Sequence, residues 1–230
     1  MSVKGFSLLE LLVVLAVMGV MMGVLGFSFL GNSSSGLGDA QRAVLSYLQQ
    51  TKAVSVGSGL ETRIIISAES DDLEKYLRHA QIITLDNNGS GHWTIMDKGI
   101  YLPKDVWFIS DSIESGNSNW PTDGECVWSA SQQDEEFRLS LTRSKNGEQK
   151  VFEESPEGTR FLFLRCLPNG NFSSSSYPQM PKLVFAKGRL IPSTSGDLIP
   201  SFTNGKEIAG VQIQPYGGIF TLDPQDFTYD

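Results

Sequence analysis

Glu10 is the residue whose position most strongly suggests a chemical role, because it lies between Leu9 and Leu11 in an otherwise apolar stretch. An ionisable side chain close to a bilayer costs about 2–4 kcal/mol and is usually retained for a function. A second explanation is structural. A carboxylate in the first turn of a helix complements the helix dipole and can extend to the lipid headgroups. The residue alone leaves both explanations open.

The rest of the chain offers few groups for catalysis or metal binding. Its only histidines, His79 and His92, lack a metal-ligand spacing, and no Gly-x-Ser-x-Gly motif is present. Asp86–Gly89 is typical of a turn and lacks the spaced donors of a calcium loop. The net charge of −8 argues against a nucleic-acid partner. We therefore predict no enzymatic activity, no metal site and no cofactor.

The two cysteines, Cys126 and Cys166, are the remaining reactive side chains. If this part of the chain is exported, the oxidising environment permits one disulfide between them. The alternative is two separate buried thiols. Spacing does not choose between these possibilities.

The segment around Glu10 has the properties of a membrane anchor. Leu11 through Leu30 contains no charged residue and no proline. As a helix, about 20 residues span about 30 Å, the thickness of a hydrocarbon core. Lys4 precedes this segment and Asp39 is the first charge after it, so the positive-inside rule places the N-terminus in the cytoplasm. We predict a single-pass membrane protein whose large C-terminal domain is exported.

The N-terminal residues resemble the processing motif of type IV prepilins and type II secretion pseudopilins: Lys4-Gly5-Phe6-Ser7-Leu8-Leu9-Glu10. The resemblance implies that prepilin peptidase removes residues 1–5 by cleavage between Gly5 and Phe6 and methylates the new N-terminus at Phe6. Glu10 is then the retained acid. Its carboxylate would pair with the Phe6 amine of a neighbouring subunit, although the spacing of four residues also permits a pair within one helix.

The later part of the chain resembles the H-type minor pseudopilins more loosely, through segments 164–170 and 211–220, the latter with a glycine turn between two strands. Together, the resemblances imply a minor pilin-like subunit of a type II secretion or type IV pilus filament. Its partners would be other pilin or pseudopilin subunits, prepilin peptidase and the bilayer. A different hypothesis is a signal-anchored exported enzyme or binding module, tethered by an uncleaved helix.

The sequence predicts how these groups are positioned. A transmembrane helix at 6–30 is followed by a Ser/Gly-rich segment at 31–38, which we interpret as a flexible break, a loosened turn or a kink. Apolar residues at helical spacing, among them Ala40, Val44 and Leu48, indicate an amphipathic helix over 39–56. Residues 60–230 form the β-rich exported domain. The predicted fold class is α+β, with a long N-terminal helix packed on a mainly antiparallel β domain.

Several short strands are predicted within 60–230. Asp71–Arg78 is interpreted as a short helix or the start of a strand, and Ser110–Gln133 and Pro192–Gly205 as inserted polar loops. The predicted strands are Thr62–Ser67, Ile82–Leu85, Trp93–Met96, Val106–Ile109, Phe137–Thr142, Arg160–Leu167, Lys182–Phe185, Ile208–Gln214 and Gly218–Leu222.

Overall fold

The structure is a computed structural model that describes residues 35–87, 91–109, 137–143, 150–172, 182–192, 198–202, 207–214 and 217–227. The chain divides into two compact units, Met1–Ser35 and Gly36–Asp230, and the described elements form the second. The predicted leader and transmembrane helix lie outside the described residues. Within the described ranges, no helix is long and apolar enough to cross a membrane.

The helix α2 spans Ser35–Ser58 and has one buried face. The buried side chains recur every three or four residues, as expected for a helix that packs on one side. The helix ends at Gly59, whose φ of +67° suits a residue without a Cβ and whose N–H donates to the Ser55 carbonyl at 3.0 Å. The residues on the buried face are Ala40, Val44, Tyr47, Leu48, Thr51 and Ser55.

The helix begins four residues earlier than the sequence predicted. Ser35–Gly38, expected to belong to a break at 31–38, is helical, and the other end extends to Ser58 instead of residue 56. A Cβ at Gly36 would lie 3.8 Å from Lys187 Cε and 3.9 Å from Val106 Cγ2. The first turn therefore packs against the β domain. Such tertiary contacts override the weak helix propensity of Gly and Ser.

Six antiparallel strands form a closed ring. In order around the ring, β1 pairs with β8, β8 with β6, β6 with β7, β7 with β3, β3 with β2, and β2 with β1. The ring is therefore a small barrel, and the two-residue strand β4 (Ile100–Tyr101) extends it beyond β2. The barrel strands are β1 (Thr62–Ser67), β2 (His79–Leu85), β3 (His92–Ile95), β6 (Phe137–Arg143), β7 (Lys150–Glu154) and β8 (Thr159–Cys166).

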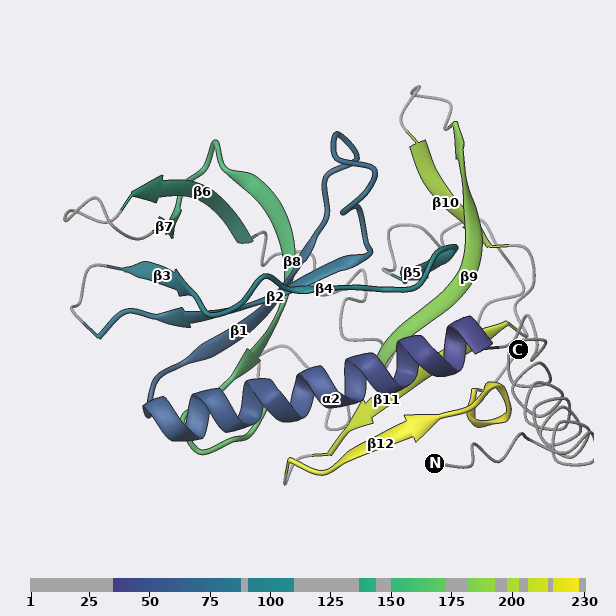
Figure 1. Cartoon of the computed structure of the whole chain (residues 1–230), viewed down its shortest axis with the longest axis horizontal. Coiled ribbons are helices and arrows are strands. Elements are labelled where there is room, and N and C mark those ends of the chain that lie inside the picture. The colour runs from purple at the N-terminus through teal and green to yellow at the C-terminus, as the bar shows by residue number, and fades with distance from the viewer. Residues whose placement is uncertain are drawn as a thin grey trace, which may run out of the picture. The chain divides into compact units, whose positions relative to one another are not determined.

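A second antiparallel sheet is built around the long strand β9 (Lys182–Pro192), which pairs with β5 (Val106–Phe108), β10 (Leu198–Phe202) and β11 (Ile208–Ile213). β12 (Ile219–Leu222) pairs with β11, and a short 3₁₀ turn, Pro224–Asp226, follows it. Figure 1 shows β9 curving away from α2 toward β10.

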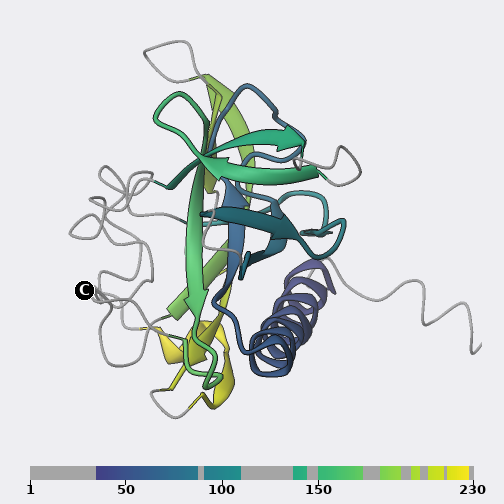
Figure 2. The same cartoon turned by 90° about the vertical axis from the view of Figure 1, so that its left-hand side faces the viewer.

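The core consists of two clusters on opposite faces of β1. Ile64 and Ile66 belong to a large cluster that includes α2 and the second sheet, whereas Ile65 belongs to the smaller cluster inside the barrel. Alternate residues of a strand point to opposite faces, so both faces of β1 are buried. This arrangement explains why β1 is a continuous apolar run. Figures 1 and 2 show α2 lying beside the strands that carry the large cluster.

The predicted α+β class, with an N-terminal helix and mainly antiparallel strands, is confirmed for the described residues. Each predicted strand overlaps an observed one, and Thr62–Ser67 coincides with β1. Other predictions were wrong. Asp71–Arg78 forms turns instead of a helix or strand, and the expected loop Pro192–Gly205 contains β10. Strands β4 and β7 were not predicted. Ser110–Gln133 lies outside the described residues.

Candidate functional site: the junction between α2 and the sheets

The residues predicted to carry processing and assembly lie outside the described part of the chain. These are Gly5, Phe6 and Glu10, together with Cys126, so their roles stay predictions. Cys166, at the end of β8, is fully buried, and its sulfur has no disulfide partner among the described residues, so the disulfide with Cys126 also stays a prediction. Burial raises the pKa of this thiol. The structure does describe α2, the first helix after the N-terminal segment, and its junction with the β domain.

Near the start of α2, Gln41 connects the helix to the second sheet. Its Nε2 donates to the carbonyl of Gly210 at 3.1 Å and to that of Leu222 at 2.9 Å. These carbonyls belong to paired residues of β11 and β12. One amide therefore holds both strands against the helix.

Halfway along α2, Tyr47 connects the helix to the turn between β3 and β4. Its hydroxyl lies 2.7 Å from Oδ2 and 2.9 Å from Oδ1 of Asp97. Asp97 Oδ1 also accepts the N–H groups of Gly99 at 3.0 Å and Ile82 at 3.3 Å. Burial, and secondly the hydrogen bond to Asp97, raise the pKa of Tyr47 well above its ordinary value. The phenol is therefore held as a neutral donor.

Farther along, Lys52 reaches the turn of the β11–β12 hairpin, where Nζ donates to the Gly217 carbonyl at 3.1 Å. Gly217 has a φ of +76°, and a Cβ at this position would lie 2.7 Å from Lys52 Nζ. The backbone conformation favours glycine here, and a Cβ would in addition require the flexible end of the Lys52 side chain to move.

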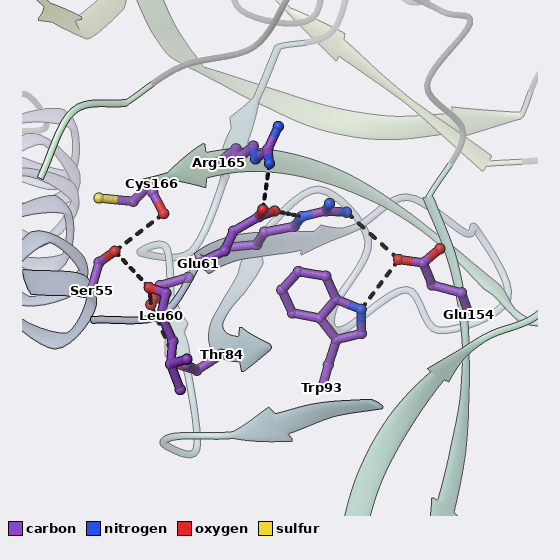
Figure 3. Close-up of polar contacts among 10 residues, drawn as sticks. Ser55, Leu60, Glu61, Thr84, Trp93, Glu154, Arg165 and Cys166 are labelled. Atoms are coloured by element: carbon purple, nitrogen blue, oxygen red, sulfur yellow. Dashed lines mark hydrogen bonds and ion pairs between the residues drawn. The ribbon is translucent and has the colours of Figure 1, made fainter. Parts of the chain in front are cut away.

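The end of α2 is joined to the barrel through Ser55. Its Oγ lies 2.9 Å from the Leu60 carbonyl and 3.2 Å from the Cys166 carbonyl, so one buried hydroxyl proton is shared between two acceptors (Figure 3). Ser55 therefore links the chain reversal after α2 to the end of β8.

Glu61, which directly precedes β1, accepts hydrogen bonds from two arginines. Oε1 accepts Arg63 Nε at 2.8 Å, and Oε2 accepts Arg165 Nη2 at 2.5 Å. We call the region around Glu61, Arg63, Trp93 and Glu154 the barrel mouth. There, Glu154 Oε1 accepts a hydrogen bond from Trp93 Nε1 at 3.2 Å and lies 4.0 Å from Arg63 Nη1 (Figure 3). These contacts link β1, β3, β7 and β8.

Arg63 also packs among three aromatic rings. Its guanidinium carbon lies 4.3 Å from the ring centroid of Trp93, 4.5 Å from that of Phe137 and 4.6 Å from that of Phe163. Only 16% of its side chain is exposed. Sequence reasoning missed this group. The available signal was the alternation of β1, which places Arg63 on the same face as Ile65.

Neither histidine belongs to a metal-ligating cluster among the described residues, where no such group of three or more side chains occurs. His79 is buried and its Nε2 lies 3.1 Å from the Lys98 carbonyl, and His92 begins β3. The described junction thus joins one helix to two sheets by polar contacts that run from Gln41 to Ser55. These contacts fix the position of α2 relative to both sheets.

Comparison with known proteins identifies the N-terminal segment. Residues 1–26 match the prokaryotic N-terminal methylation motif. This match confirms the predicted resemblance of the N-terminus to proteins that are processed and methylated. No curated protein matches the chain significantly.

Two solved structures of the minor pseudopilin EpsH, from the type 2 secretion system of Vibrio cholerae, are similar to the chain. One is 13% identical, with 82% of this chain and 97% of that chain covered and a TM-score of 0.37. The other is 12% identical, with 84% and 99% covered and a TM-score of 0.40. At these identities and TM-scores, the similarity supports no inference about function.

Proposed function

We propose that this chain is a minor pilin-like subunit, a pseudopilin of a type II secretion system or a minor pilin of a type IV pilus. The observation that carries the proposal is the N-terminal methylation motif at residues 1–26. The order of elements supports it, because the next described element is a helix with one face buried on an antiparallel β domain. The subunit performs no reaction. Its function is assembly into a filament.

In the proposed assembly, prepilin peptidase cleaves between Gly5 and Phe6 and methylates Phe6. The apolar segment that follows holds the subunit in the inner membrane, with the β domain exported. The Glu10 carboxylate then meets the Phe6 amine of a neighbouring subunit, an attraction that is strong in low dielectric. Because α2 is tied to both sheets, the β domain follows when the N-terminal segment enters the filament.

Mass spectrometry of the mature N-terminus tests the processing step. We expect the purified membrane form to begin at N-methylated Phe6, and we expect Gly5→Glu to block cleavage, since the peptidase requires a small residue before the scissile bond. A matched control is Gly38→Ala, which leaves the motif unchanged and should be processed normally. An intact Met1 in the native protein would instead favour the tethered enzyme or binding module.

Gene deletion distinguishes the two filament systems. A strain without this chain should lose exported enzymes from the medium if the chain is a pseudopilin, or surface filaments if it is a minor pilin. Complementation with the native gene should restore the phenotype. Loss of neither would contradict the proposed function.

A further inference from the structure

At the barrel mouth, the guanidinium of Arg63 packs against the apolar cluster that fills the barrel interior. The buried residues of the interior cluster are Ile65, Ile83, Trp93, Phe137, Leu139 and Phe163. Arg63 lies on the same face of β1 as Ile65 and extends among the three aromatic rings of this cluster. The guanidinium is therefore surrounded by aromatic side chains from three other strands.

The geometry of these rings is that of a cation site. Trp, Tyr and Phe rings attract a cation that lies within about 6 Å of the ring centroid, and the attraction increases when the cation is shielded from water. All three measured distances, 4.3, 4.5 and 4.6 Å, satisfy this limit. Trp93 and Phe137 meet edge to face, with an interplanar angle of 86°, so together the rings enclose the cation from different directions.

Two carboxylates complete the site and favour a guanidinium. Glu61 accepts Arg63 Nε at 2.8 Å, and Glu154 lies 4.0 Å from Nη1. Glu154 is oriented by Trp93 Nε1, one of the rings that contact the guanidinium. A planar guanidinium both stacks on rings and donates in the plane to carboxylates, which an ammonium group does less well.

We propose that the barrel mouth is an aromatic-cage cation site that Arg63 fills from within the chain, and that an external guanidinium ion occupies it when the side chain is removed. The ligand class is a monosubstituted guanidinium, as carried by arginine. This inference is independent of the proposed function, since it concerns the β domain and not the N-terminal motif.

The test uses the full-length protein in detergent with Arg63→Ala. Ethylguanidinium, which has the donors of the arginine head group, should raise the thermal unfolding midpoint of this variant saturably. We expect about 3–5 °C at a tenfold excess over Kd. Its neutral isostere ethylurea should have no such effect. The native protein, whose site is filled, should respond to neither. An equal response of variant and native protein would overturn the proposal.

If Arg63→Ala does not fold, the series Arg63→Lys and Arg63→Met still tests the cage. Lysine keeps the charge, whereas methionine keeps an unbranched apolar chain. We expect the unfolding midpoint to fall from arginine to lysine to methionine. The matched control is Arg42→Met, an exposed arginine paired only with Asp39 in the described structure, which should leave the midpoint unchanged. A methionine variant as stable as the native protein would overturn the proposal.

Discussion

Tyr47 shows how one residue can fix the position of an element. It lies on the buried face of α2, yet its hydroxyl reaches a carboxylate that also accepts the N–H groups of Gly99 and Ile82. The helical spacing of apolar residues over 39–56 predicts the buried face but gives no indication of Asp97, fifty residues from Tyr47. Periodicity indicates which face of a helix is buried, whereas the polar partner depends on the turn that the sheet brings there.

Replacing Tyr47 by phenylalanine should remove this link while preserving the packing of the ring. We expect Tyr47→Phe to reduce the free energy of unfolding by about 1.5–3 kcal/mol, because the hydrogen bond is to a charged acceptor in a partly buried site. Denaturant unfolding measures the change. The control is Tyr101→Phe, a tyrosine that is 45% exposed and should be close to neutral. Equal effects of both variants would contradict the proposed role of the Asp97 contact.

The raised pKa of Tyr47 also predicts a pH dependence. An unfolded tyrosine loses its proton near pH 10, whereas the folded Tyr47 keeps it. Above that pH the unfolded state binds fewer protons, so the contribution of Tyr47 to stability falls as pH rises. The difference in unfolding free energy between native protein and Tyr47→Phe should therefore shrink between about pH 9 and 11. A constant difference across this range would be inconsistent with a buried neutral phenol.

At the scale of elements, two glycines differ in the space around them: Gly38 has open space, whereas Gly158 lies close to the backbone of another strand. A Cβ at Gly38, in α2, would meet nothing within 4 Å. At Gly158, in the turn before β8, a Cβ would lie 2.5 Å from the carbonyl carbon of Leu139 in β6. The same residue type therefore serves two purposes. In α2 it lowers helix propensity, and in the barrel it permits β6 and the turn to approach each other.

The two glycines make a matched pair of alanine substitutions. Gly38→Ala should raise the free energy of unfolding by up to about 1 kcal/mol, because alanine has the higher helix propensity and the space is free. Gly158→Ala should lower it by about 1–3 kcal/mol, because the backbone of β6 would have to shift. Urea titration measures both. A stabilising effect at Gly158 would show that the turn is free to move away from β6.

At the scale of the whole molecule, the proposed function assigns assembly to one part of the chain and the folded core to another. Glu10 lies in the N-terminal unit, whereas the described cores, α2 and both sheets belong to the unit from Gly36 onward. A change at Glu10 should therefore affect the contact between subunits without affecting the β domain.

We expect Glu10→Ala to reduce the yield of filaments at least about tenfold, because loss of a charge pair worth about 1.4 kcal/mol or more changes an equilibrium tenfold. Filament yield is measured by shearing and immunoblotting, and the far-UV circular dichroism of the purified subunit should be unchanged. The matched control is Ser7→Ala, three residues before Glu10 in the sequence and without charge. Normal filament yield from Glu10→Ala would show that the acid is not needed for assembly.

The sequence alone determined the features that depend on local pattern: the N-terminal motif with Gly5, Phe6 and Glu10, the amphipathic helix, and most strands, including β1 at its observed bounds. Only the tertiary structure decided which strands meet. β1 pairs with β8, about a hundred residues later, to close the barrel, and this closure brings Trp93, Phe137 and Phe163 around Arg63. The physical reason is that periodicity reports which side of an element is buried, whereas pairing is set by long-range packing and hydrogen bonding that no local window contains.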